Sequence, residues 1–159
     1  MAKIYYPINL DIEGGKAVVV GGGAVAERKV GTLFDFGARV TVISTSFTPG
    51  LSRLRKRGKI RLIKRKFRAG DIEGALLVIA ATDDRKVNEK VSLIARRAEV
   101  LVNVVDQPKL CSFIAPSVIK RGPLVVSIST SGQAPALAKA LRLKLEKVIT
   151  PGLGKLAQE

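Results

Sequence analysis

The fold is indicated most clearly by the residues Lys16-Ala17-Val18-Val19-Val20-Gly21-Gly22-Gly23-Ala24-Val25-Ala26. Its first five residues are an apolar, β-branched run, which is typical of a strand buried in a parallel sheet. Apolar residues then recur at helical spacing, and the helix is expected to stop at Gly37. Between strand and helix, the first glycine of Gly21-x-Gly23-x-x-Ala26 allows a tight turn and the second lets the backbone approach a pyrophosphate. The stretch therefore predicts a phosphate-binding loop at Gly21, Gly22 and Gly23, with a ligand-free glycine turn as the alternative.

The pattern of strand followed by helix repeats after this loop. Further apolar runs predict strands, and amphipathic stretches between them predict helices that begin at Pro49 and after Asp83 or Asp84, either of which can cap a helix. The expected strands cover residues 39–43, 60–63, 76–80 and 101–105, and the expected helices cover 49–57 and 85–98. Alternation of this kind predicts an α/β fold, and right-handed crossovers favour a Rossmann-type parallel five-stranded sheet in the order 3-2-1-4-5.

The alternation of strands and helices ends after Asp106. Residues 112–115 and 124–129 are expected to be strands without a long helix between them, and a helix is expected over 134–149 with Leu137, Leu141, Leu145 and Val148 on one face. We therefore divide the chain into a nucleotide-binding domain, residues 1–110, and a small C-terminal α+β segment, residues 111–159. About fifty residues are too few for an independent core, so this segment is expected to pack on the first domain or on a second subunit.

Composition limits the chemistry. The chain of 159 residues carries 28 Lys and Arg against 13 Asp and Glu, a net charge of +15, and ten of the basic residues lie between Arg53 and Arg68. Such a field attracts polyanions, although a run of this kind is often only a solvated surface. The chain has no histidine and one cysteine, Cys111, so no metal site is expected and proton transfer falls to carboxylates, lysine or tyrosine. The chain shows neither a signal peptide nor an apolar run long enough for a membrane span, which favours the cytoplasm and no membrane partner.

The ends of the predicted strands supply the candidate site residues. Ser44, Thr45 and Ser46 stand after the second strand, where a NAD site usually has an acidic residue that binds the ribose. Hydroxyl groups can contact the ribose but do not reject a 2′-phosphate, so the choice between NAD and NADP stays open. Thr82, Asn103 and Asp106 follow the fourth and fifth strands and are expected to converge on the cleft. Asn103 could instead be a turn residue, whereas Asp106 is favoured as a functional group because the chain has few other bases.

A second polar cluster precedes the last helix. Ser129, Thr130, Ser131 and Gly132 combine hydroxyl groups with a glycine, and such a combination can bind an anion at the start of a helix. A helix cap with a turn is expected from these residues whether or not an anion binds there. We treat these four residues, together with Asn103, as candidates for substrate binding.

Several motifs in the same order resemble the precorrin-2 dehydrogenase family, which includes the amino-terminal part of siroheme synthase. The resemblance runs from about Pro7 to Lys147. It rests on Pro7-Ile8-Asn9-Leu10, residues 18–29 (VVVGGGAVAERK), Ala80-Ala81-Thr82-Asp83-Asp84 with Val87-Asn88, Asn103-Val104-Val105-Asp106, and residues 129–138 (STSGQAPALA).

The resemblance implies NAD-dependent oxidation of precorrin-2 to sirohydrochlorin, on the route to sirohaem, by a homodimer joined through its C-terminal segment. The catalytic aspartate of the family matches Asp106. Its NAD contacts match Ala24, Val25, Thr45 and Ser46, and we add Thr82 and Val104 at the strand ends as cofactor candidates. Precorrin-2 carries many carboxylates, and a protein of charge +15 attracts such a molecule.

This chain also departs from the family. Thr130 stands where the family has a serine that can be phosphorylated, and the methyltransferase domain fused in siroheme synthase is not in the chain, so methylation is not expected of it. Some members also insert iron, a step that would depend on Asp106 in a chain without histidine. The main rival is a non-catalytic NAD-sensing module that dimerises through its tail. Nucleic-acid binding by residues 53–68 is disfavoured, because Phe67 is the one aromatic residue there that could stack on a base.

Overall fold

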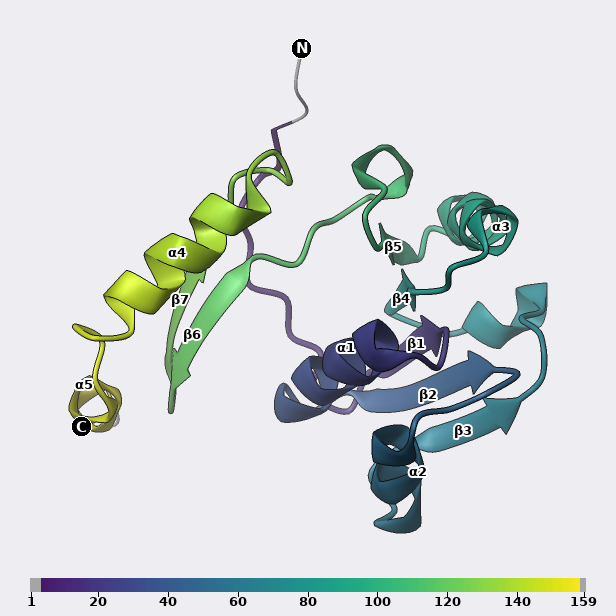
Figure 1. Cartoon of the computed structure of the whole chain (residues 1–159), viewed down its shortest axis with the longest axis horizontal. Helices are drawn as coiled ribbons and strands as arrows, with labels where there is room; N and C mark the ends of the chain where they lie inside the picture. The colour runs from purple at the N-terminus through teal and green to yellow at the C-terminus, as the bar shows by residue number, and fades with distance from the viewer. Residues whose placement is uncertain (1–3, 158–159) are drawn as a thin grey trace. The chain divides into compact units, whose positions relative to one another are not determined.

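The computed structural model describes residues 4–157, which form two units. One unit is Pro7–Phe113, and the other consists of the residues from Ile114 onward together with the short stretch that precedes Pro7. Figure 1 shows the course of the chain through both. No helix of the described residues is long and apolar enough to cross a membrane.

The first unit is built on a parallel sheet of five strands. The strands are β1 (Lys16–Val20), β2 (Arg39–Ser44), β3 (Arg61–Lys64), β4 (Leu77–Ala80) and β5 (Leu101–Val104). Their order is β3-β2-β1-β4-β5, as the sequence predicts. The order reverses at β1, so the crevice for a ligand opens where the chain leaves this central strand.

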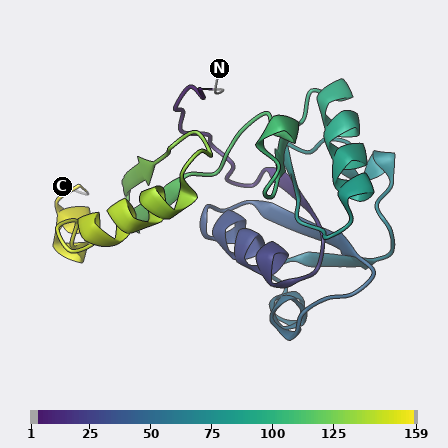
Figure 2. The same ribbon diagram turned by 45° about the horizontal axis from the view of Figure 1, so that its top comes forward.

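Helices cover both faces of this sheet. They are α1 (Ala24–Asp35), α2 (Pro49–Lys56) and α3 (Arg85–Arg97), and two short 3₁₀ helices, η1 (Ala69–Ile72) and η2 (Pro108–Leu110), lie in the connections. Right-handed crossovers place α1 and α2 on one face, because the chain moves outward from β1 to β3, and α3 on the other (Figure 2). Asp84 caps α3 by accepting hydrogen bonds from the amides of Lys86 and Val87, which confirms one of the two predicted caps.

The core of this unit follows from the apolar runs. Alternate residues of β1 point to opposite faces: Ala17 and Val19 pack with α1, and all strand residues from Ala17 to Val20 are buried. On the side of α1 and α2, the cluster includes Val30, Leu51 and Ile79. Burial on both faces explains why β4 and residues 17–20 of β1 are apolar throughout instead of alternating.

The second unit contains a two-stranded antiparallel sheet and two helices. The strands are β6 (Ser117–Arg121) and β7 (Leu124–Ile128), and the helices are α4 (Pro135–Leu145) and α5 (Pro151–Leu156). Helix α5 approaches β6 closely, because a Cβ atom at Gly154 would lie 2.3 Å from the carbonyl oxygen of Arg121. The Arg121 side chain also donates a hydrogen bond to the carbonyl of Ile149, at 3.2 Å.

Three expectations for the C-terminal segment, residues 111–159, are wrong. Residues 112–115 are not a strand: the Ser112 amide and hydroxyl pair with the backbone of Val102, and the hairpin begins only at Ser117. The helix expected over 134–149 ends at Leu145 and gives way to turns. No hydroxyl side chain caps this helix, whose N-cap residue is Ala134. Positive φ angles at Ser131 and Gly132 keep those residues out of the helix.

Candidate functional site: a glycine loop and a neighbouring aspartate

The glycine loop has a backbone that side chains would obstruct. Gly21 has φ +125°, and a Cβ atom there would lie 2.2 Å from the carbonyl oxygen of Ala81. A Cβ atom at Gly22 would lie 1.9 Å from the carbonyl oxygen of Ser46. Both positions therefore need glycine for the loop to pass between the ends of β2 and β4.

Gly23 differs from Gly21 and Gly22, because its lack of a side chain leaves the start of α1 open to a ligand. A Cβ atom at Gly23 would meet nothing within 4 Å, so protein packing does not require glycine at this position. Gly23 is the N-cap of α1, and no side chain caps the helix there. The amide groups of the first turn of α1 are thus left for a ligand, and the helix dipole favours an anion at this end. The loop fits the diphosphate of a dinucleotide.

A cavity of about 670 Å³ opens from this loop. It is lined by residues 20–25, 43–48, 65–67, 81–84 and 87. The structure thus brings together most of the predicted cofactor residues, namely Gly21, Gly22, Gly23, Ala24, Val25, Ser44, Thr45, Ser46 and Thr82. Arg65, Lys66 and Phe67 also line the cavity, and sequence reasoning missed them because the segment after β3 meets the end of β2 only when the sheet is assembled.

A second, smaller cavity of about 210 Å³ shares lining residues with the first. Val25 and Thr82 line both cavities, and the smaller one also includes Asn88, Val105 and Asp106. Asn88 is buried on α3, where it is joined to Thr82 by two hydrogen bonds of 2.9 Å. This pair fixes the end of β4 against α3, a role that a lone asparagine in a helix does not reveal in the sequence.

Asp106 stands at the edge of the smaller cavity in an unusual conformation. Its φ is +59°, in the left-handed region that aspartate and asparagine tolerate better than most residues. The side chain is exposed, and its carboxylate has no hydrogen bond or ion pair with the described part of the chain. A carboxylate held outside the core beside Val25 can accept a proton from a substrate that lies next to the glycine loop.

Lys29 is a further residue that sequence reasoning missed. It lies on α1, one turn after Val25, and is partly buried. Burial lowers the pKa of Lys29, and the charge of Arg28 lowers that pKa further. The carboxylate of Asp106 acts in the opposite direction, so the two opposite charges lie near enough to interact.

Asn103 and Val104 do not reach either cavity. Both residues are buried: the Asn103 amide donates to the carbonyl of Phe113 at 3.1 Å, and the Val104 amide donates to the sulfur of Cys111 at 3.1 Å. They therefore hold the segment after η2 against β5. The following residue, Val105, lines the smaller cavity instead.

The hydroxyl cluster before α4 belongs to the second unit. Ser129 accepts a hydrogen bond from the Ser131 amide, and Thr130 accepts one from the Ala134 amide, both at 3.1 Å. The predicted turn is therefore present. Anion binding by Ser129, Thr130, Ser131 and Gly132 stays a prediction.

Comparison with known proteins assigns the chain to a family. Residues 8–117 match a family described as putative NAD(P)-binding, and residues 121–147 match one described as sirohaem biosynthesis protein central. The chain belongs to the NAD(P)-binding family found in siroheme synthases. The resemblance inferred from the motifs is confirmed.

The relatives are bacterial siroheme synthases. The protein of Methylococcus capsulatus is 49% identical over 97% of this chain and 32% of its own length, and that of Serratia proteamaculans is 46% identical over the same shares. The chain thus spans about a third of the curated relatives it matches. Among solved structures, SirC, a precorrin-2 dehydrogenase, matches with a TM-score of 0.82 and 26% identity over 97% of this chain and 76% of that one.

Proposed function

We propose that this chain of the siroheme synthase family is a NAD-dependent dehydrogenase that acts in the cytoplasm and oxidises precorrin-2 to sirohydrochlorin. One observation carries the proposal: the carboxylate of Asp106 and the start of the loop helix at Val25 line one cavity, directly beside the larger nucleotide cavity. The match to a precorrin-2 dehydrogenase and to siroheme synthases supports the choice of substrate.

Different residues of the chain bind the cofactor, accept the proton and attract the substrate. Gly21, Gly22 and Gly23 hold the diphosphate of the dinucleotide, which when bound supplies the hydride acceptor. Asp106 accepts the proton that the tetrapyrrole loses as a ring carbon gives up hydride, so the products are sirohydrochlorin, NADH and a proton. Lys29 keeps positive charge near this carboxylate, and the basic surface of the chain attracts the acidic substrate.

The proposed enzyme is a homodimer joined through its second unit. Helix α4 exposes Leu137, Leu141 and Leu145, which are 53%, 40% and 37% accessible and follow one another at intervals of four residues. Such a stripe covers one face of a helix and is costly to leave in water. A second copy of the same unit would bury it.

The test is turnover of precorrin-2 with NAD, followed through NADH absorbance and the spectrum of sirohydrochlorin. Asp106→Asn is the informative variant, because asparagine tolerates the positive φ whereas alanine would add backbone strain. Loss of a proton acceptor is expected to lower turnover by a factor on the order of a hundred or more, with NAD affinity nearly unchanged.

The matched control is Asp11→Asn, an equal change of charge at an exposed aspartate that lines neither cavity. It should turn over precorrin-2 like the wild type. NAD binding without any consumption of precorrin-2 by the wild type would favour the NAD-sensing module instead.

A further inference from the structure

The nucleotide cavity has an edge formed by the ends of β2 and β3. These strands are parallel and Ser44 pairs with Lys64, so the residues that follow them leave the sheet side by side. Both segments, residues 44–48 and 65–67, line the same cavity. In Rossmann-type sites the adenosine ribose binds at the end of β2, so this edge faces the ribose hydroxyls.

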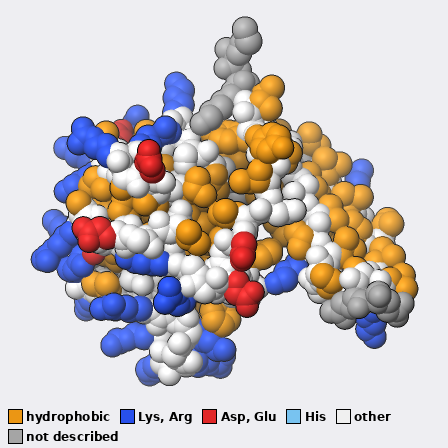
Figure 3. All heavy atoms as spheres, turned by 180° about the vertical axis from the view of Figure 1, so that it is seen from behind, with side chains coloured by type: hydrophobic (Ala, Val, Ile, Leu, Met, Phe, Trp, Pro, Cys, Tyr) orange, Lys and Arg blue, Asp and Glu red, His pale blue; other side chains and the backbone are white. Residues whose placement is uncertain are grey.

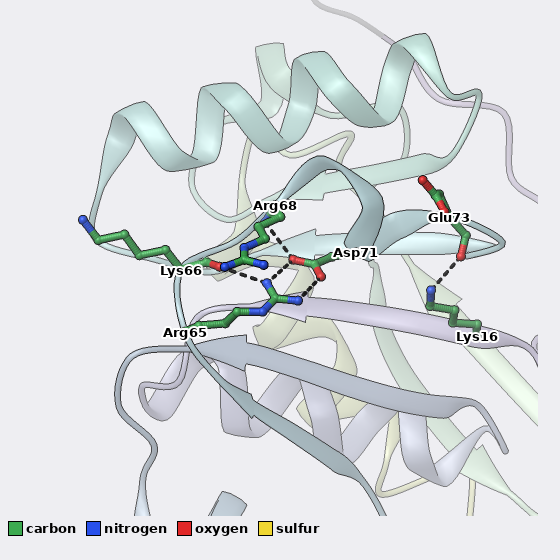
Figure 4. A network of polar contacts seen from close by, with 6 residues as sticks. All are labelled: Lys16, Arg65, Lys66, Arg68, Asp71 and Glu73. Atoms are coloured by element: carbon green, nitrogen blue, oxygen red, sulfur yellow. Dashed lines mark hydrogen bonds and ion pairs between the residues drawn. The ribbon is translucent and has the colours of Figure 1, made fainter.

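Arg65 is fully engaged within the protein. Its guanidinium donates to both oxygens of the Asp71 carboxylate, at 2.8 and 2.6 Å, and to the carbonyl of Lys66, at 3.0 Å (Figure 4). The amide of Arg68 adds a hydrogen bond of 2.7 Å to the same carboxylate. These bonds, led by that of Arg65, hold the pKa of Asp71 below its ordinary value. The turn after β3 is therefore held in one conformation, and the charge of Asp71 is neutralised.

Lys66 lies on this turn, and its ammonium is available to bind a ligand. Figure 4 shows its side chain extending away from the Asp71 carboxylate, and its ammonium makes no hydrogen bond with the described part of the chain. The acidic residues that line the cavity are Asp83 and Asp84, which follow β4 on the opposite side of the loop, and Asp84 caps α3. The edge formed by β2 and β3 thus carries hydroxyl groups and a cation where a carboxylate would repel a phosphate.

We propose that this edge binds an adenosine 2′-phosphate, with Lys66 and the hydroxyls of Thr45 and Ser46 as its partners, so that the chain accepts NADP as well as NAD. The proposal rests on the nucleotide site of the proposed function. Hydroxyl and ammonium groups donate hydrogen bonds to phosphate oxygens, and a bond between two charged groups is among the stronger ones. Lys66 then determines how well the phosphorylated cofactor competes with NAD.

The experiment compares two fragments that differ only by this phosphate, AMP and adenosine 2′,5′-bisphosphate, in calorimetric titrations of the whole chain at fixed salt. The wild type is expected to bind the bisphosphate at least as tightly as AMP. Lys66→Ala should weaken the bisphosphate about tenfold, the effect of one charged hydrogen bond, and leave AMP within about twofold. Lys66→Glu should weaken the bisphosphate further, and Lys66→Arg should preserve it.

Lys90→Ala is the control for net charge, because Lys90 is an exposed lysine on α3 that lines neither cavity. It should bind both fragments like the wild type. The proposal is overturned if the wild type binds AMP tenfold better than the bisphosphate, or if Lys66→Ala weakens both fragments equally. If neither fragment binds the folded wild type, the nucleotide site itself fails and the proposed function fails with it.

Discussion

The two units differ in how completely they bury their apolar residues. In the unit Pro7–Phe113, strand residues from both faces of the sheet are buried beneath three helices. In the second unit, the exposed large apolar residues include Leu137, Leu141, Val148, Leu153 and Leu156. Figure 3 shows Lys and Arg side chains gathered over the first unit and hydrophobic ones over the second. The first unit has a core of its own, whereas the second exposes apolar side chains that the second copy of the proposed dimer would cover.

Gly22→Val should have the strongest effect on the first unit. The new side chain would collide with the carbonyl oxygen of Ser46, which a Cβ atom would approach to 1.9 Å, so the loop cannot keep its path. We expect nucleotide binding to be abolished while the association of chains is unchanged, since the two properties belong to different units. Calorimetry with NAD and sedimentation of the same sample measure both. Normal NAD affinity in this variant would remove the glycine loop from the site.

The corresponding variant of the second unit is the double substitution Leu137→Glu with Leu141→Glu, on the exposed face of α4. Carboxylates in the proposed apolar interface would lose water without gaining a partner, so the dissociation constant of the proposed dimer should rise by a factor on the order of a hundred or more. NAD affinity should stay the same. Analytical ultracentrifugation over a range of concentrations measures the change. A variant that associates like the wild type would place the interface elsewhere.

In the unit Pro7–Phe113, Leu51→Ala should lower the free energy of unfolding by about 2 to 5 kcal/mol, because removing a fully buried leucine side chain leaves a cavity. Leu93→Ala is the control: Leu93 lies on α3 and is 51% accessible, so its loss should change stability by less than about 0.5 kcal/mol. Urea denaturation followed by circular dichroism gives both values. Equal losses would mean that this core is less tightly packed than its burial implies.

The smallest expected effect concerns the turn after β3. Asp71→Asn removes the ion pair with Arg65, which should lower the urea midpoint at neutral pH, by less than Leu51→Ala does because solvent screens the Arg65 charge. The pKa of Asp71 is lowered in the folded chain, so its stabilisation is complete above the ordinary aspartate pKa of about 3.9 and is lost as the pH falls through the folded value. The difference between wild type and variant, measured by urea midpoints, should be constant from pH 7 to about 4.5 and shrink below. A difference that grows on acidification would contradict this account.

The sequence predicted the sheet well because its strands are short apolar runs separated by glycine turns and amphipathic helices. Burial on both faces leaves such runs no other stable arrangement. The second unit was predicted less well, since its strands are only partly buried and their pattern is weak. The irregular backbone at residues 112–115 is stabilised by hydrogen bonds with β5, and such long-range contacts cannot be inferred from the local sequence pattern.

The order of the strands, the glycine loop and the membership of a family described as putative NAD(P)-binding follow from the sequence alone, because they depend on local spacing and apolar periodicity. Which strand ends meet depends on how the chain folds in three dimensions. Folding buries Asn103 and Val104 in the core, leaves Asp106 exposed beside Val25, and brings Lys66, which follows β3, into the same cavity as the residues at the end of β2. Such neighbours are far apart along the chain, and only the register of parallel strands sets the distance between them.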